Sequence, residues 1–375
     1  MWKRAFPAVL MIAVCGVPSL RAAITDMTCE ADAAQRYALY LPSNYAADRE
    51  WNLILAFDAG ARGKLAVERL QAAAEKYGYI VAGSYNSRNG PWGISLAAAS
   101  AMKADVLKRY KINPKRIYTA GQSGGARVAM QLAMSGGIAG VIASSAGFPD
   151  PSDAPKKLSF PVFGTAGTED FNYTEMRDLD SHLTSPHRIE IFEGGHQWLP
   201  SELAVKAVGW MEVQAIKSGV SPKNDALLDK IFDARVAEIM QQKTDFETWR
   251  AVSQLSQDFQ GLEDVKQFYQ DSIALMSDAK VRNALNAEIA EVNREKRLTN
   301  ELYEMVQTYA STPSNGIKAL RAQVEKYAAQ GKAPEDSPDR RMARRIVAGL
   351  AAGSRGIDDA DFQKLMDSVR PPRAQ

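Results

Sequence analysis

The sequence is poor in cysteine and histidine: its 375 residues include two cysteines, Cys15 and Cys29, and three histidines. Cys15 lies within a predicted signal peptide, so the exported protein would keep Cys29 alone and could form no internal disulfide. Stability must therefore come from packing, for which a hydrophobic content of 46% is ample. The scarcity of histidine also restricts the search for a catalytic base to three positions.

The sequence also lacks a surplus of charge of either sign. Of its 46 basic side chains, Lys3, Arg4 and Arg21 fall within the predicted signal peptide, which leaves 43 against 44 acidic ones. Proteins that bind nucleic acid through phosphate contacts carry a basic surplus, so no nucleic-acid partner is expected. No H-E-x-x-H, paired C-x-x-C or G-x-G-x-x-G occurs, so we expect no metal and no cofactor.

The first 22 residues have the composition of a secretory signal peptide. Residues 1–4 include the basic Lys3 and Arg4, residues 5–17 form an apolar run, and Ala22 offers a small residue for cleavage. The run is too short to span a bilayer, and the rest of the sequence contains no apolar stretch of membrane-spanning length. A lipoprotein anchor on Cys15 is the alternative, but Val14 is bulky where a small residue is expected. We therefore expect an exported protein, periplasmic or secreted, without an integral membrane segment.

Short apolar runs alternate with helical patterns between residues 35 and 218. Strands are expected at 37–41, 51–57, 79–83, 116–120, 141–144, 161–164 and 188–192. Helices are expected between them, at 64–76, 94–110, 126–134, 173–183 and 202–217. This alternation predicts a mostly parallel sheet flanked by helices on both faces. In such sheets the reacting groups gather at the carboxyl ends of the strands.

After about residue 220 the pattern is helical throughout. Helices are expected at 225–242, 246–259, 262 to about 309, 316–330, 338–352 and 359–369. The sequence thus predicts a signal peptide (1–22), an α/β domain (23–219) and an all-α domain (220–375). Breaks between the helices, at 311–316 and 331–338, indicate helical hairpins. Because no faithful repeat occurs, both an irregular bundle and tetratricopeptide-like hairpins stay open.

The pentapeptide Gly121-Gln122-Ser123-Gly124-Gly125 fits G-x-S-x-G, the nucleophile elbow, and lies between an expected strand and an expected helix. A strand that turns abruptly into a helix exposes the serine at the turn. Only very small residues fit two positions to either side, which accounts for Gly121 and Gly125. Ser123 is therefore the candidate nucleophile, and the backbone N–H of Gly124 is a candidate donor to an oxyanion.

A nucleophilic serine needs a base to take its proton and an acid to orient that base. His196 follows the strand expected at 188–192 on a tight loop, at the carboxyl edge of the sheet. His182 lies within a helical pattern, and His187 lies at the opposite end of that strand. We therefore expect His196 to be the base.

The acid is expected on the loop after the strand at 161–164, which carries Glu169 and Asp170. Asp170 is favoured because its shorter side chain is held more firmly, and Glu169 is the alternative. An acid at this place could also simply cap the following helix. The chain order Ser123, Asp170, His196 is the one expected of this kind of site.

The second oxyanion donor is expected after the strand at 51–57, from the backbone of Gly60 or Ala61. With these motifs, residues 35–218 resemble a compact α/β-hydrolase, similar to secreted carboxylesterases of the polyhydroxybutyrate-depolymerase and feruloyl-esterase kind. The resemblance implies an eight-stranded sheet with a Ser-His-Asp site that cleaves an ester, or less often an amide, through an acyl-enzyme. The chain departs from the family pattern at Asp58-Ala59, where such enzymes usually have His-Gly.

Other residues are expected to border the substrate pocket. Asn86 and Arg88 lie on a loop that follows another strand, at the same edge of the sheet. Arg88 has two interpretations, binding a substrate carboxylate or bracing its own loop. Trp198, two residues past His196, is expected either to form a wall of the acyl pocket or simply to pack.

The sequence thus predicts an exported serine hydrolase, first of all a carboxylesterase, that acts on a small-molecule or polymer ester. A serine peptidase of the prolyl-oligopeptidase type is an alternative, although the sequence has no counterpart of the propeller that precedes such domains. A binding or scaffold protein with a degenerate hydrolase domain is a second alternative, motivated by Asp58-Ala59. The helical part could cover the pocket, recognise a polymer or dock a protein partner.

Overall fold

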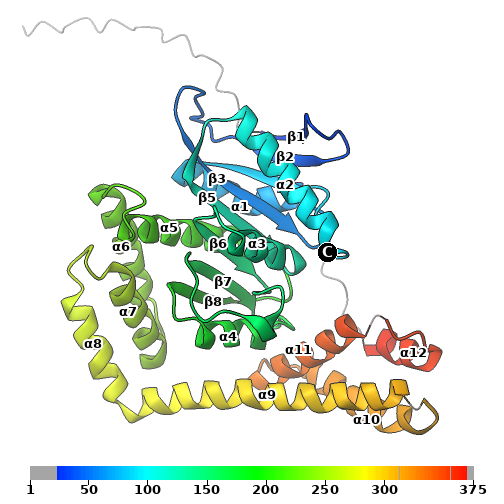
Figure 1. Ribbon diagram of the computed structural model, residues 1–375. Helices are drawn as coiled ribbons and strands as arrows, with labels where there is room; N and C mark the ends of the chain where they lie inside the picture. The colour runs from blue at the N-terminus through cyan, green and yellow to red at the C-terminus, as the bar shows by residue number, and fades with distance from the viewer. Residues whose placement is uncertain (1–22, 312, 355, 370–375) are drawn as a thin grey trace, which may run out of the picture.

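The computed structural model describes residues 23–311, 313–354 and 356–369. They form a mostly parallel sheet flanked by helices, followed by a run of further helices, so the predicted fold class is confirmed (Figure 1). The predicted signal peptide at 1–22 and the alternative anchor at Cys15 lie outside the described residues. None of the helices in the described ranges combines the length and the apolar character that crossing a membrane requires.

The described residues form an eight-stranded sheet. Its strands are β1 (Ile24–Thr28), β2 (Arg36–Tyr40), β3 (Trp51–Asp58), β4 (Tyr79–Ser84), β5 (Ile112–Gln122), β6 (Gly140–Ser144), β7 (Val162–Gly167) and β8 (His187–Phe192). They lie in the order β1-β2-β4-β3-β5-β6-β7-β8. β2 pairs antiparallel with both β1 and β4, and all later neighbours are parallel. This is the strand order of the α/β-hydrolase fold.

All the predicted strands are present, and β1 is an addition that the sequence analysis missed. β1 lies at the edge of the sheet, and none of its residues is fully buried. An edge strand with a solvated surface needs no continuous apolar run, so its sequence gives a weak signal.

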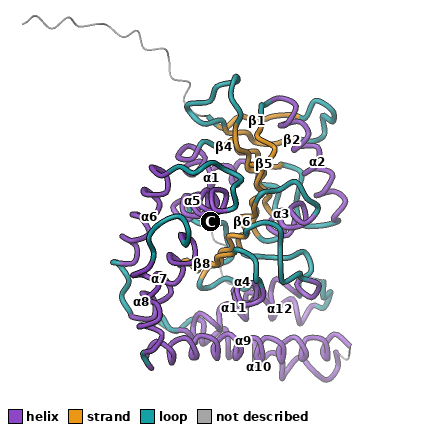
Figure 2. Tube along the Cα trace, turned by 60° about the vertical axis from the view of Figure 1, so that its left-hand side comes forward, coloured by secondary structure: helices purple, strands orange, loops and turns teal. Residues whose placement is uncertain are grey.

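The strands bury side chains on both faces, which is why they read as continuous apolar runs. Along β3, Leu53, Leu55 and Phe57 pack toward α2 (Trp92–Arg109), α3 (Gly124–Met134) and α4 (Tyr173–His182). The alternate residues Ile54 and Ala56 pack toward α1 (Gly63–Tyr77) and α5 (Ser201–Lys217). Figure 2 shows the sheet between these two helical layers. Because β3 to β8 all run in the same direction, their carboxyl ends lie at one edge of the sheet, where the loops after them form the candidate site.

The C-terminal part is helical, as predicted. Its helices are α6 (Asp225–Ile239), α7 (Asp245–Phe259), α8 (Lys266–Ser277), α9 (Ala279–Ser311), α10 (Pro313–Gly331), α11 (Pro338–Gly353) and α12 (Ala360–Val369). The long helix expected at 262–309 is two helices, because Asp278 is extended and its carboxylate accepts the N–H of Lys280 at 2.7 Å. α10 begins at Pro313 rather than at residue 316, since proline is well suited to the first turn of a helix.

These helices pack in two groups. α6 and α7 pack on α5 through a small core that includes Leu228, Leu255 and Phe259. α9 then runs along one side of the α/β part toward α10–α12, as Figure 1 shows. The last four helices share a second core, built around residues such as Leu302 and Leu350. The length of α9 thus carries α11 to the edge of the sheet where the candidate site lies.

Candidate active site

The turn between β5 and α3 occupies a single residue, Ser123. Its backbone has φ 56° and ψ −124°, a conformation that costs a non-glycine residue about 1–3 kcal/mol. Its N–H donates to the carbonyl oxygen of Ser144 at 2.8 Å. A Cβ at Gly121 would lie 2.2 Å from the carbonyl oxygen of Gly125, and one at Gly125 would lie 2.0 Å from that of Phe57. Glycine is therefore required at both positions, as the motif predicts.

The loops after β7 and β8 bring a carboxylate and an imidazole together. Nδ1 of His196 lies 2.7 Å from Oδ1 of Asp170, whose side chain is fully buried and also accepts the N–H of Asn172 at 2.9 Å. When Nδ1 donates to a carboxylate, Nε2 of the neutral ring is left as a proton acceptor. The ring of Phe171 stacks on the imidazole with centroids 3.9 Å apart and an interplanar angle of 24°, which holds the plane of His196.

The competing residues are engaged elsewhere. His182 contacts a backbone carbonyl oxygen through Nε2 at 2.8 Å, and both ring nitrogens of His187 contact carbonyl oxygens, at 2.7 and 2.9 Å. Glu169, the alternative acid, forms an ion pair with Arg344 of α11 at 2.7 Å. Nε2 of His187 also lies 3.6 Å from Oδ1 of Asp180, but His196, paired with Asp170, is the histidine that lines a cavity together with Ser123.

Ser123 and His196 line one cavity of about 690 Å³. No hydrogen bond joins the Ser123 hydroxyl to the imidazole within the described residues. In enzymes without substrate this bond is often long and shortens only in the complex. Thr299 and Tyr303 of α9 and Ile346 of α11 line the same cavity, so the C-terminal helices form part of its wall.

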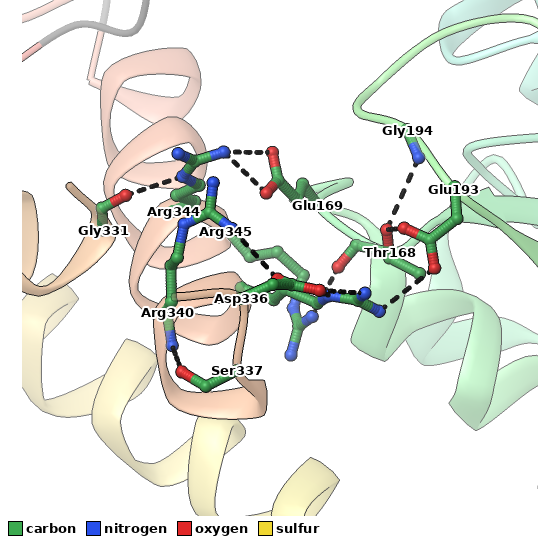
Figure 3. Close-up of polar contacts among 11 residues, drawn as sticks. Thr168, Glu169, Glu193, Gly194, Gly331, Asp336, Ser337, Arg340, Arg344 and Arg345 are labelled. Atoms are coloured by element: carbon green, nitrogen blue, oxygen red, sulfur yellow. Dashed lines mark hydrogen bonds and ion pairs between the residues drawn. The ribbon is translucent and has the colours of Figure 1, made fainter. Parts of the chain in front are cut away.

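Arginines of α11 attach this helical wall to the loop that carries the acid. Arg345 is almost fully buried and forms a bidentate ion pair with Glu295 of α9 while donating to the carbonyl oxygen of Thr168 at 2.6 Å. Arg344, one residue earlier, pairs with Glu169 (Figure 3). Asp170 directly follows Glu169 in the chain. These contacts therefore hold α9, α11 and the loop that carries Asp170 together as one unit. Of the three roles that the sequence leaves open for the helical part, covering the pocket agrees with this arrangement, because residues of α9 and α11 line the cavity.

The loop after β3 is organised around Asp58. The carboxylate is fully buried and accepts the N–H of Gly60 at 2.8 Å, the indole N–H of Trp198 at 2.7 Å and two N–H groups of Arg62 at 2.8 and 2.9 Å. The N–H of Ala61 donates to the backbone carbonyl oxygen of Asp58 at 3.1 Å. Burial alone would raise the pKa of Asp58, but the hydrogen bonds from Arg62, Trp198 and Gly60 outweigh it and hold the pKa below its ordinary value.

The expectation of an oxyanion donor in this loop therefore needs correction. Gly60 and Ala61 were expected to donate to an oxyanion, but their N–H groups are used within the loop, and neither residue is among the described residues that line the cavity. Of the two interpretations of Trp198, a pocket wall or a packed side chain, the structure agrees with the second, because the indole is buried in the core beside α1 and α5. The carboxylate of Asp58 accepts the N–H of Gly60 and the indole N–H of Trp198, and its backbone carbonyl oxygen accepts the N–H of Ala61.

The remaining pocket candidates divide. Arg88 and Gly124 line the cavity. Asn86 does not line it within the described chain: its side chain accepts the N–H of Arg36 at 2.8 Å and donates to a carbonyl oxygen at 3.0 Å, so it fastens the loop to β2. Sequence reasoning missed Phe171, although an aromatic residue directly after a candidate acid was a visible signal.

Other reactive groups are remote or inert. Among the described residues, no group of three or more histidine, cysteine and acidic side chains could hold a metal ion. Cys29 is buried, and burial together with the nearby Asp105 raises the pKa of its thiol to about 11. A thiol with such a pKa stays protonated at neutral pH and is a poor nucleophile.

Comparisons with known proteins add little beyond the fold. No protein-family model matches the chain, and no curated protein matches it either. Similar solved structures include the esterase LipW from Mycobacterium marinum (17% identity, 51% of this chain and 81% of that chain, TM-score 0.41) and an esterase from Pyrobaculum calidifontis (11%, 53% and 87%, 0.40). A puromycin-hydrolyzing peptidase from Mycobacterium tuberculosis is also similar (11%, 55% and 41%, 0.41). At such identities the likeness concerns the fold alone.

The substitution Asp58→Asn tests the role of this carboxylate. An amide nitrogen cannot accept from Arg62 or Trp198, so we expect the free energy of unfolding to fall by about 1–3 kcal/mol at neutral pH. Because the pKa of Asp58 is depressed in the folded state, its contribution is complete above its ordinary value of 3.8 and is lost as the pH falls through the folded-state pKa.

Urea unfolding at neutral pH and at about pH 3 measures this difference. We expect the difference in the free energy of unfolding between wild type and D58N to be smaller at about pH 3 than at neutral pH. Asp48→Asn, at an exposed acid, should change the free energy of unfolding little at either pH. A gap that is independent of pH would contradict the role assigned to Asp58.

Proposed function

We propose that the protein is a serine hydrolase, a carboxylesterase in which Ser123 is the nucleophile, His196 the general base and Asp170 the acid that orients the base. The observation that carries the proposal is the 2.7 Å hydrogen bond between His196 and the buried Asp170. His196 lines the same cavity as Ser123, which has the backbone conformation of a nucleophile elbow.

The reaction follows from these positions. The Ser123 hydroxyl attacks the ester carbonyl carbon while Nε2 of His196 takes its proton, and Asp170 stabilises the imidazolium that forms. The N–H of Gly124, at the N-terminus of α3, donates to the oxyanion. The tetrahedral intermediate collapses when His196 returns the proton to the leaving alcohol. Water, deprotonated by His196, then hydrolyses the acyl-enzyme and restores the Ser123 hydroxyl.

A fluorophosphonate and the substitution Ser123→Ala test this proposal. We expect the wild-type protein to gain the mass of one adduct, located on Ser123, and S123A to gain none. Turnover of a short-chain nitrophenyl ester should fall by a factor of about 10³–10⁶ in S123A, because no nucleophile replaces the hydroxyl. Ser135→Ala, at an exposed serine on the surface, should behave as wild type.

A panel of acyl esters and peptides separates the alternatives. Turnover of peptides but not esters would assign the site to a peptidase. Absence of both activities and of labelling would instead favour a binding protein, and S123A with retained turnover would remove Ser123 from the mechanism.

The charge of the cavity points to a substrate that carries an anionic group. Among the described residues the cavity is lined by four arginines, Arg62, Arg88, Arg127 and Arg345. Three have acidic partners: Arg62 pairs with Asp58, Arg127 with Glu175 and Arg345 with Glu295.

Arg88 differs from the other three. It is exposed, and its guanidinium has no ion pair or hydrogen bond within the described residues. Its backbone is held by two hydrogen bonds with the hydroxyl of Ser95, at 3.2 and 2.8 Å. A cation on a fixed backbone, directed to the cavity and without an acidic partner, suits a carboxylate on the substrate.

Arg88→Gln tests this substrate class. We expect kcat/KM for an ester with a free carboxylate to fall by about 10- to 100-fold, because a charge-assisted hydrogen bond is lost. The neutral methyl ester of the same compound should be hydrolysed nearly as well as by wild type. Arg69→Gln, on the exposed surface of α1, serves as the control. Equal losses for the charged and neutral substrates would show that Arg88 braces its loop instead.

A further inference from the structure

The proposed acyl transfer still lacks one oxyanion donor. Acyl transfer requires stabilisation of the developing negative charge, usually by two donors, and the N–H of Gly124 supplies one. The donors expected from Gly60 and Ala61 are bound to Asp58. The second donor must therefore come from a different group near Gly124.

The side chain of Asn89 lies against this glycine. A Cβ built on Gly124 would lie 1.7 Å from Oδ1, 2.9 Å from Cγ and 3.6 Å from Nδ2 of Asn89. The amide thus occupies the space beside Gly124 in which a side chain would stand. Asn89 lines the cavity together with Ser123 and His196.

The position of Asn89 is fixed by its backbone. Its N–H donates to the carbonyl oxygen of Ala59 at 2.8 Å, and Gly60 and Arg88 form a β-bridge beside it. The loops after β3 and β4 are thereby joined, and this connection holds residue 89 over the turn between β5 and α3. The Asn89 amide itself has no hydrogen-bond partner within the described residues, so its donors are available to a substrate.

The identity of residue 124 agrees with this arrangement. In G-x-S-x-G this position is variable, since the glycines that the turn requires are Gly121 and Gly125. A third glycine at this point leaves room for the neighbouring amide. Rotation of the amide by 180° exchanges Oδ1 and Nδ2, so that an N–H can face the oxygen bound next to the N–H of Gly124.

We infer that the side-chain amide of Asn89 is the second oxyanion donor, taking the place of the loop N–H groups that Asp58 withdraws. The inference rests on the proposed function, because it assigns a role in the same acyl transfer. The negative oxygen of the tetrahedral intermediate would accept one bond from the Gly124 backbone and one from Nδ2 of Asn89. Ala59, which also lines the cavity, offers the rival donor through its backbone N–H.

Asn89→Ala and Asn89→Asp test the assignment on a neutral nitrophenyl ester. Loss of one side-chain donor should lower kcat by about 10²–10³ and leave KM nearly unchanged, since the bond strengthens in the transition state. N89D keeps the shape but replaces the donor by a negative charge, so its kcat should fall at least as far. Asn283→Ala, at an exposed position of α9, is the matched control.

Gly124→Ala provides an independent arm, because its methyl group would displace the Asn89 amide. We expect G124A to lower kcat strongly in the wild-type background and to add little in the N89A background, the non-additivity of two changes that remove one interaction. Wild-type kcat in N89A would overturn the inference and favour the Ala59 N–H. Full additivity of the two changes would also overturn it.

The outcome is distinguishable from failure of the proposed function. If S123A retains turnover or the wild type is not labelled, the serine mechanism itself fails. If the wild type is labelled and active while N89A equals it, only the role of Asn89 is lost.

Discussion

The candidate site depends on the close approach of two backbone segments at the turn between β5 and α3. Gly125 touches the carbonyl oxygen of Phe57 on the neighbouring strand, and Gly121 touches Gly125, so neither position has space for a Cβ. Only this approach allows the chain to leave the sheet within one residue. The strained conformation of Ser123 follows from it, and so does the direction of the helix whose first N–H belongs to Gly124. The packed backbone around the turn offsets the cost of the strain.

The second constraint is the buried guanidinium of Arg345. Its side chain binds Glu295 of α9 and the backbone of Thr168 at the same time. Removing one partner of a buried ion pair leaves an uncompensated buried charge, so the loss of either Arg345 or Glu295 alone would be far more costly than the loss of an exposed partner. It joins the C-terminal helices to the loop that carries Asp170. The helical part therefore forms part of the cavity wall and is not a separate appendage.

Much of this arrangement could be predicted from the sequence because it depends on local patterns. The strand and helix periods, the G-x-S-x-G turn and the place of His196 after a strand are all short-range signals. The partners of Asp58 could not be predicted, because Trp198 lies 140 positions away in the chain. The contribution of α9 and α11 to the cavity wall could not be predicted either, because the break at Asp278 and the packing of α9 decide where α11 lies. The donors expected from Gly60 and Ala61 are bound within their own loop, Gly60 to the buried carboxylate of Asp58 and Ala61 to its backbone carbonyl oxygen.

We propose that Ser123, His196 and Asp170 act together at a cavity whose wall includes residues of α9 and α11. A crystal structure of the protein after reaction with a phosphonate ester would show whether they do. We expect phosphorus bonded to Oγ of Ser123, with Nε2 of His196 within hydrogen-bonding distance of an oxygen of the adduct and Nδ1 still bound to Asp170. Phosphorus on another residue, or an imidazole turned away from the adduct, would contradict it.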